Sequence, residues 1–322
     1  MTLQTASLAA GRNPVSKHAD LVYSTMHGRE LPADLYLPEG AKTALPVIVW
    51  LHGGGWRLGD KRLGPNLSRF FAERGFAMVS IDYRLSDEAL FPAQVIDVKA
   101  AVRWIRSVAG RYSLDGEHIG LWGSSSGGHL AACAALAGPD EFESGEHDGL
   151  SSAVEAVVDG YGPIDFLQME KYMPAASKHE ADRESQAVMT AKPVGDADSF
   201  ESLLIGSPVY TAPEAVRRAN PISYMRPGAP PFLILHGLSD ILVPWQQSRL
   251  LFDALEAAGN DATLLLMEKL GHGFLNNSRL DKADCGRITL HRSGQNATGS
   301  EAEPSSFGFN TIEAFFRKHL CA

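Results

Sequence analysis

A serine flanked by glycines carries the strongest chemical signal in this chain. Residues 123–127 read Gly-Ser-Ser-Ser-Gly, the G-x-S-x-G pattern, between an apolar run at 118–122 and a helix-like stretch that includes Leu130. A sharp turn from strand to helix exposes the central hydroxyl, and the start of the helix brings backbone N–H groups beside it. We therefore predict that Ser125 is a nucleophile. The alternative is a glycine- and serine-rich turn without chemistry.

A serine nucleophile needs a base to take its proton and an acid to orient that base. In proteins with this elbow, the order along the chain is Ser, then Asp or Glu, then His. Asp240 and His272 follow two late apolar runs in that order, and glycines flank His272. We predict these two residues as acid and base. Asp165 is the alternative acid, and His236 competes for the role of base.

A run of glycines predicts the oxyanion hole. Residues 52–56 read His-Gly-Gly-Gly-Trp directly after an apolar run. Glycines let the backbone approach a ligand and turn N–H donors toward one point. We expect the backbone N–H groups of Gly53, Gly54 and Ser126 to hold the oxyanion, and His52 to shape the loop.

Two aromatic residues are candidates for the substrate pocket. Trp56 adjoins the glycine run, and Tyr161 follows the fourth apolar run. Each could equally be ordinary core, because a lone aromatic residue near a strand end is often packing alone.

The remaining sequence predicts the elements that position these residues. Short Val/Ile/Leu-rich runs, typical of strands covered on both faces, occur at 45–51, 76–82, 118–122, 154–159, 231–236 and 262–268. Amphipathic stretches with a helical period occur at 92–109, 245–258 and 310–320. Strands alternating with helices predict an α/β fold with a mostly parallel sheet and helices on both faces. The more alternating stretch 21–37 predicts an antiparallel edge pair.

Two segments do not follow the alternation. Residues 166–215 are polar, charged and dotted with proline, and residues 278–305 are rich in Ser, Gly, Asn and charge. We predict one domain over 1–322, with 166–215 as a partial cap insertion and 278–305 as a long loop after His272. A loop of that length in a compact domain is usually functional or mobile.

Composition limits the other function classes. The 322 residues are 44% hydrophobic and 21% charged, with a net charge of −9, which excludes a disordered or collagen-like chain. An acidic surface repels phosphates and anionic lipid, so we expect neither nucleic acid nor a membrane as partner. The three cysteines form no metal or disulfide pattern, although pairing of Cys285 with Cys321 stays open. The N-terminus reads as lacking a signal peptide, which predicts a cytoplasmic protein.

These motifs together resemble a known family. The segments DLYLP (34–38), LHGGGWRLGDKR (51–62), GLWGSSSGGHLA (120–131), HGLSD (236–240) and GHGF (271–274) are similar to those of α/β-hydrolases of the hormone-sensitive-lipase-like esterase group. The nearest likeness is to its bacterial branch of acetyl-xylan and feruloyl esterases. The resemblance implies Ser125 as nucleophile, Asp240 as acid, His272 as base and Gly53 and Gly54 in the oxyanion hole. This chain departs from its relatives in having serine on both sides of the nucleophile.

The resemblance implies a serine esterase that acts on small to medium esters without metal or cofactor. Short-chain acyl esters, acetylated sugars and hydroxycinnamoyl esters are candidate substrates, and oligomeric state is not predicted. An amidase, arylformamidase or peptidase could use the same triad, since a fold does not choose among these reactions. A true lipase and a binding protein without catalysis are more remote alternatives.

Overall fold

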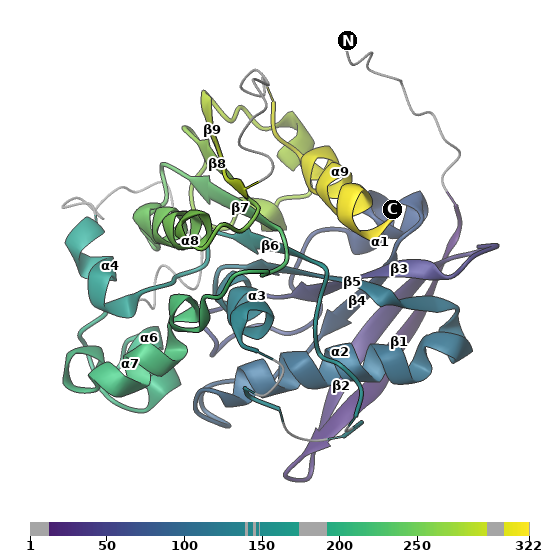
Figure 1. Cartoon of the computed structure of the whole chain (residues 1–322), viewed down its shortest axis with the longest axis horizontal. Coiled ribbons are helices and arrows are strands. Elements are labelled where there is room, and N and C mark those ends of the chain that lie inside the picture. Colours follow the sequence, from purple (N-terminus) through teal and green to yellow (C-terminus); the bar gives the residue numbers. More distant parts are fainter. Residues whose placement is uncertain are drawn as a thin grey trace.

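The computed structural model of the chain describes residues 13–138, 141–143, 146–147, 149–173, 192–294 and 306–321. Its described part is built on one nine-stranded sheet in the order β1-β2-β4-β3-β5-β6-β7-β8-β9 (Figure 1). Strands β4, β3, β5, β6, β7 and β8 are parallel to one another. Antiparallel strands flank them at both edges. The predicted α/β class with a mostly parallel sheet is confirmed.

The strands coincide closely with the apolar runs of the sequence. Their bounds are β1 (Val15–Met26), β2 (Arg29–Pro38), β3 (Leu45–Leu51), β4 (Ala77–Ile81), β5 (Leu114–Ser124), β6 (Ala156–Gly160), β7 (Phe232–Gly237), β8 (Ala262–Met267) and β9 (Ile288–Arg292). The expected antiparallel edge pair is β1 and β2, which is longer than its sequence pattern indicated.

Helices cover both faces of this sheet. Their bounds are α1 (Leu67–Phe70), α2 (Ala93–Tyr112), α3 (Ser126–Leu136), α4 (Phe166–Tyr172), α6 (Phe200–Ile205), α7 (Pro213–Ala219), α8 (Gln246–Ala257) and α9 (Phe309–Leu320). Short 3-10 turns are η1 (Ala72–Arg74), η3 (Val209–Thr211), η4 (Pro221–Tyr224), η5 (Phe274–Asn276) and η6 (Leu280–Lys282). None of the described helices has the length and apolar character that a bilayer crossing requires.

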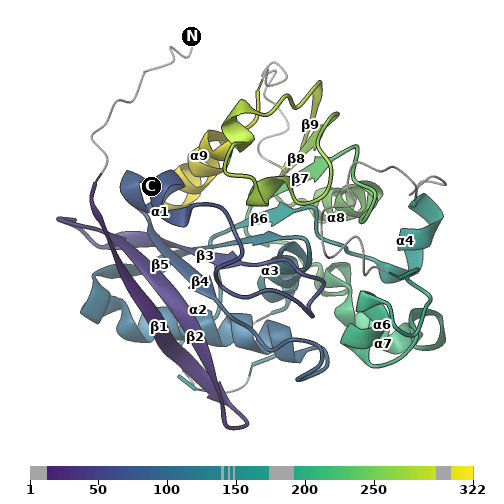
Figure 2. The ribbon, with the colours of Figure 1, turned by 180° about the vertical axis from the view of Figure 1, so that it is seen from behind.

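The side chains of the central strands alternate between two cores. In β3, Val47, Val49 and Leu51 belong to the core under α2, α3 and α8, whereas Ile48 and Trp50 belong to the core under α1 and α9. This period-two alternation follows from the pleat of a strand. Figures 1 and 2 show the helices against the sheet from opposite sides.

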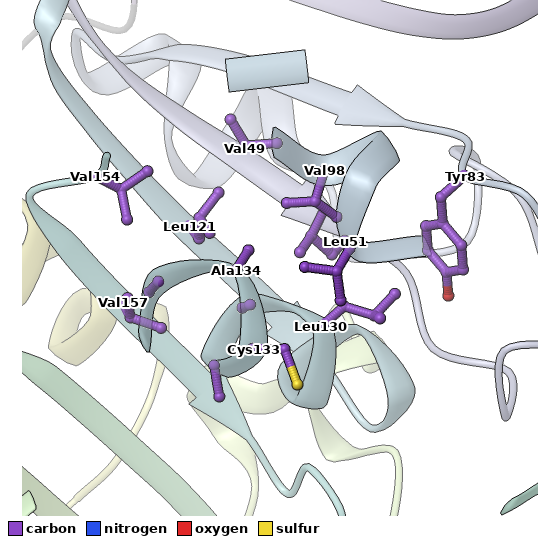
Figure 3. Packing of buried hydrophobic residues seen from close by; sticks show 14 of the residues in the cluster. Val49, Leu51, Tyr83, Val98, Leu121, Leu130, Cys133, Ala134, Val154 and Val157 are labelled. Atoms are coloured by element: carbon purple, nitrogen blue, oxygen red, sulfur yellow. The ribbon is translucent and has the colours of Figure 1, made fainter. Parts of the chain in front are cut away.

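The helix that follows the glycine–serine motif is buried along its whole length. Figure 3 shows Leu130, Cys133 and Ala134 of α3 packed against Leu121 and Val157 of the sheet. Burial of this apolar area against close-packed neighbours fixes α3, and with it the residue at its N-terminal end.

The structure differs from the expected loop at 278–305. Its described part contains η6 and the edge strand β9, which pairs antiparallel with β8. Residues 295–305 lie outside the described residues. The strand was missed because it is short and polar, with only its first residue fully buried, so no clear apolar run marks it. His272 therefore precedes the final strand of the described sheet.

The expected insertion 166–215 contains α4, α6, η3 and the start of α7 in its described parts, and residues 174–191 lie outside them. The three cysteines are free thiols, so the pairing of Cys285 with Cys321 that the sequence left open is not made.

Candidate active site

Ser125 occupies the turn between β5 and α3. Its φ of 54° and ψ of −124° are unusual for a residue with a side chain, and such strain persists only where the surroundings enforce it. The Ser125 N–H donates a 2.7 Å hydrogen bond to the Gly160 carbonyl of the neighbouring strand. Adjacent packing holds the turn as well, because a Cβ at Gly127 would lie 2.1 Å from the Leu51 carbonyl oxygen.

The structure brings together three side chains that are far apart along the chain. The Ser125 Oγ and the His272 Nε2 are 2.9 Å apart, and the His272 Nδ1 and the Asp240 Oδ2 are 2.7 Å apart. Both distances are within hydrogen-bonding range. They come together because the carboxyl ends of the parallel strands β5, β7 and β8 lie at one edge of the sheet.

The carboxylate of Asp240 is almost fully buried and well supplied with donors. The backbone N–H groups of Leu242 and Val243 each donate to its Oδ1 at 2.9 Å. Burial alone would raise the pKa of Asp240, but the charge and hydrogen bonds of His272 and His236 outweigh it and hold the pKa well below its usual range. The group therefore stays ionised wherever the enzyme is folded at ordinary pH.

His236, which the sequence offered as a competitor to His272, has a different place in the structure. It lies behind the acid and not beside the serine: its Nε2 is 3.2 Å from the Asp240 Oδ2 and 3.0 Å from the Val243 carbonyl oxygen. Its Nδ1 is 2.7 Å from the Ser248 Oγ. With Ser248 donating to Nδ1, the Nε2–H is available to both oxygens. His236 therefore supports Asp240, a role that its place at a strand end could not reveal.

The glycine loop after β3 lies against the serine turn. A Cβ at Gly53 would be 3.2 Å from the Ser125 Cβ, so the Gly53 backbone is beside the nucleophile. His52 shapes this loop as expected: its Nδ1 is 2.7 Å from the Gly53 carbonyl oxygen, and its ring stacks on Tyr83 at 4.3 Å. The Tyr83 hydroxyl donates to the His52 carbonyl at 2.9 Å. These contacts hold the loop in a single shape.

Trp56 and Tyr161 are both buried beside the site. The Trp56 Nε1–H donates to the His129 Nδ1 at 3.2 Å, and burial lowers the pKa of His129 to about 4, so this imidazole is neutral and can accept. The Tyr161 ring meets the His272 ring edge-on at 4.8 Å. Tyr161 therefore packs against the imidazole itself.

The other candidate acid does not reach the site. Asp165 forms the N-cap of α4, where its side chain accepts from the Leu167 N–H at 3.1 Å and from the Gln168 amide at 2.8 Å. Capping of this kind is the common structural use of aspartate at a helix start.

Two pockets open on Ser125. The first, here the α6 pocket, has a volume of about 400 Å³ and is lined by Ser126, Trp56 and residues of α4 and α6, among them Phe200 and Glu201. The second, here the His272 pocket, has a volume of about 520 Å³ and is lined by Gly53, Gly54, Tyr161, His272, Asp60 and Arg62. The serine thus lies where two differently lined spaces meet.

Comparisons with known proteins show that the chain is similar to esterases. The family model described as BD-FAE matches residues 33–255. Esterase LipQ of Mycobacterium tuberculosis is 33% identical over 254 residues, which cover 77% of this chain and 55% of LipQ. The chain spans about half the length of the curated relatives it matches.

Solved structures resemble the chain over more of its length. A truncated form of a carbohydrate esterase from gut microbiota superimposes with a TM-score of 0.74 and 28% identity, covering 98% of this chain and 99% of that one. A butyrate-bound esterase, Est2 of Thermogutta terrifontis, has a TM-score of 0.61 and 26% identity, covering 82% of this chain and 86% of its own.

Proposed function

The chain belongs to the BD-FAE family, as its motifs predicted, and we propose that it is a serine carboxylic-ester hydrolase acting through Ser125, His272 and Asp240. Its α/β-hydrolase fold, also predicted, is confirmed by the likeness to solved esterases. The observation that carries the proposal is the continuous line of hydrogen bonds from the Ser125 hydroxyl through His272 to Asp240.

In the first half of the reaction the Ser125 Oγ attacks the ester carbonyl and its proton passes to the His272 Nε2. Asp240 accepts from the Nδ1–H, which keeps the Nε2 free as a base and stabilises the imidazolium that forms. The lowered pKa of Asp240 keeps its negative charge in place for this purpose.

The carbonyl oxygen becomes an oxyanion, and the backbone N–H groups of Gly53, Gly54 and Ser126 are its proposed donors. Placement of Gly53 beside Ser125 and of Ser126 at the first position of α3 supports this. Such fixed donors stabilise charge that develops only in the transition state. Collapse of the intermediate releases the alcohol, which takes the proton from His272, and leaves an acyl-serine.

Water then completes the cycle by the same steps. His272 takes a proton from water, the hydroxide attacks the acyl-serine, and the carboxylic acid leaves as Ser125 recovers its proton.

The two pockets divide the substrate between them. The leaving alcohol must lie within reach of the His272 Nε2, and His272 lines the second pocket. We therefore assign the alcohol to the His272 pocket and the acyl group to the α6 pocket. The described part of the segment 166–215 contributes several of the residues that line the α6 pocket, which supports the proposal that it is a partial cap on a single domain.

A direct test combines covalent labelling with turnover. A fluorophosphonate probe should label the wild-type protein at one residue, identified as Ser125 by peptide mass spectrometry, and p-nitrophenyl butyrate should be hydrolysed. Comparison of the butyrate ester with p-nitrobutyranilide separates an esterase from an amidase. Labelling elsewhere, or preference for the anilide, would contradict the proposal.

Replacing Gly54 by alanine should reduce kcat by about 10²–10³, the usual effect of losing one oxyanion donor. Gly54 has a φ of 125°, and a Cβ there would lie 2.1 Å from the Leu58 carbonyl oxygen, so the loop must shift. Steady-state kinetics on p-nitrophenyl butyrate measures the effect. Gly228→Ala, at an open turn far from the loop, serves as the control, and equal losses in both variants would refute the assignment.

A further inference from the structure

A buried acidic residue lines the α6 pocket and has no part in the mechanism above. Glu201, in the first turn of α6, is only 8% exposed and lines the same pocket as Ser125. A carboxylate removed from water costs free energy unless a positive charge or several hydrogen bonds compensate it. Its surroundings therefore indicate whether the group is structural or awaits a ligand.

Among the residues that the structure describes, Glu201 has no positively charged partner. Within the described part of the chain, no ion pair joins Glu201 to a basic side chain. Lys192 lines the same pocket, but its side chain is exposed. The like charge of Glu170 acts on Glu201 and raises its pKa. The Glu170 oxygens accept from the Gly195 N–H and the Tyr210 hydroxyl.

The rest of the pocket favours a cation over a neutral polar group. Trp56 and Phe200 contribute aromatic surface, and Met169 and Met173 contribute polarisable apolar surface. Aromatic rings attract cations through their electron-rich faces. Two acidic residues, Glu201 and Glu170, line the pocket, whereas its one lysine, Lys192, is exposed.

We propose that the α6 pocket is a subsite for an acyl group that carries a positive charge, with Glu201 as the counter-charge. The proposal rests on the proposed esterase function and names the class of acyl group that it prefers. A cationic group attached to the acyl chain would lie among the aromatic and methionine side chains, with its charge opposed to the carboxylate.

The direction of the pKa shift of Glu201 agrees with a buried carboxyl that has hydrogen bonds but no positively charged partner among the described residues. Burial is the main cause that raises its pKa to about 7, and Glu170 adds to the rise, while its own backbone N–H and Ser199 oppose it. A bound cation would favour the ionised form, because an opposite charge at close range stabilises it.

The test uses three p-nitrophenyl esters of equal chain length, each corrected for its spontaneous hydrolysis. One carries a trimethylammonio group at the end of a butyryl chain, the second replaces that group by the isosteric tert-butyl group, and the third ends in a methoxy group, which has no O–H to attack the ester. In the wild type, kcat/KM for the cationic ester should exceed that for the tert-butyl ester. Equal values, or a preference for the methoxy ester, would overturn the proposal.

Glu201→Gln should lower kcat/KM for the cationic ester by about 10- to 100-fold, the range expected when a partly screened attraction between opposite charges is lost. It should leave kcat/KM for the tert-butyl ester within about twofold. The matched control is Glu214→Gln on the neighbouring helix α7, where Glu214 is exposed and pairs with Arg217. This control should change neither ester. Loss of equal size on both esters in Glu201→Gln would show a structural role and contradict the proposal.

Thermal unfolding at pH 8 separates the two roles independently of turnover. If the Glu201 carboxyl holds α6 in place, Glu201→Gln should have a lower melting temperature than the wild type. If the carboxylate lacks a positive partner, as we propose, the melting temperature of Glu201→Gln should not fall. If the wild type fails to hydrolyse p-nitrophenyl butyrate, the esterase function itself is wrong. If it hydrolyses butyrate without preferring the cationic ester, only the inference about Glu201 fails.

Discussion

Replacing Ser125 by alanine is expected to reduce kcat for p-nitrophenyl butyrate by about 10⁶, as in other enzymes with this triad. The change removes the only atom proposed to attack the carbonyl, the Oγ that lies 2.9 Å from the His272 Nε2. What remains is the slower attack by water in a site that still binds the ester. Fluorophosphonate labelling should disappear together with turnover.

The adjacent serine provides the matched control. Ser126→Ala removes a hydroxyl but keeps the backbone N–H that we assign to the oxyanion hole. Its kcat should therefore stay within about tenfold of wild type, which corresponds to at most about 1.4 kcal/mol of activation free energy. If both variants lose activity equally, the turn has been disturbed and the nucleophile is not identified. Near-normal turnover by Ser125→Ala would falsify the mechanism.

Replacing Asp240 by asparagine is expected to reduce kcat by about 10⁴, the loss seen when the orienting acid of such a triad becomes an amide. An amide can donate its N–H to the His272 Nδ1, which moves the imidazole proton to the Nε2 and removes the base. It also removes the charge that stabilises the imidazolium. Steady-state kinetics on p-nitrophenyl butyrate gives the loss directly.

Asp165→Asn is the control for this change. It makes the same chemical substitution at the residue that was the alternative acid, and asparagine keeps the N-cap of α4. Activity near wild type in Asp165→Asn and a large loss in Asp240→Asn are the expected pair of results. The reverse pair would transfer the acid role to Asp165.

Much of the candidate site was predictable because its signals are local. Glycine is required at 123 and 127, on either side of Ser125, because a Cβ at either position would lie 2.1 Å from a backbone carbonyl oxygen. The G-x-S-x-G motif is therefore sufficient to predict the turn. The apolar runs of the central strands are equally local, since burial on both faces excludes polar residues from them.

Other features of the structure could not be predicted from the residues near them in the sequence. His236 contacts Asp240 through a geometry that only the packing of β7 against α8 creates. Glu201 lies in a polar segment whose helices are short, and nothing in its neighbours along the chain indicates that it lines a pocket with Ser125. The edge strand β9 carries too little apolar character to be recognised.

The amino-acid sequence alone was sufficient to predict the α/β class, the order of the central elements and the candidates Ser125, Asp240 and His272. Strand burial and the tight serine turn are visible in neighbouring residues, and the order of the three candidates is read directly along the chain. The tertiary structure decided which side chains meet: the 2.7 Å and 2.9 Å contacts of His272, the second histidine behind Asp240, and the carboxyl of Glu201 in the α6 pocket. Parallel strand pairing and helix packing bring these residues together. The free energy of each contact depends on the distance between atoms in space, and the spacing of residues along the chain does not determine that distance.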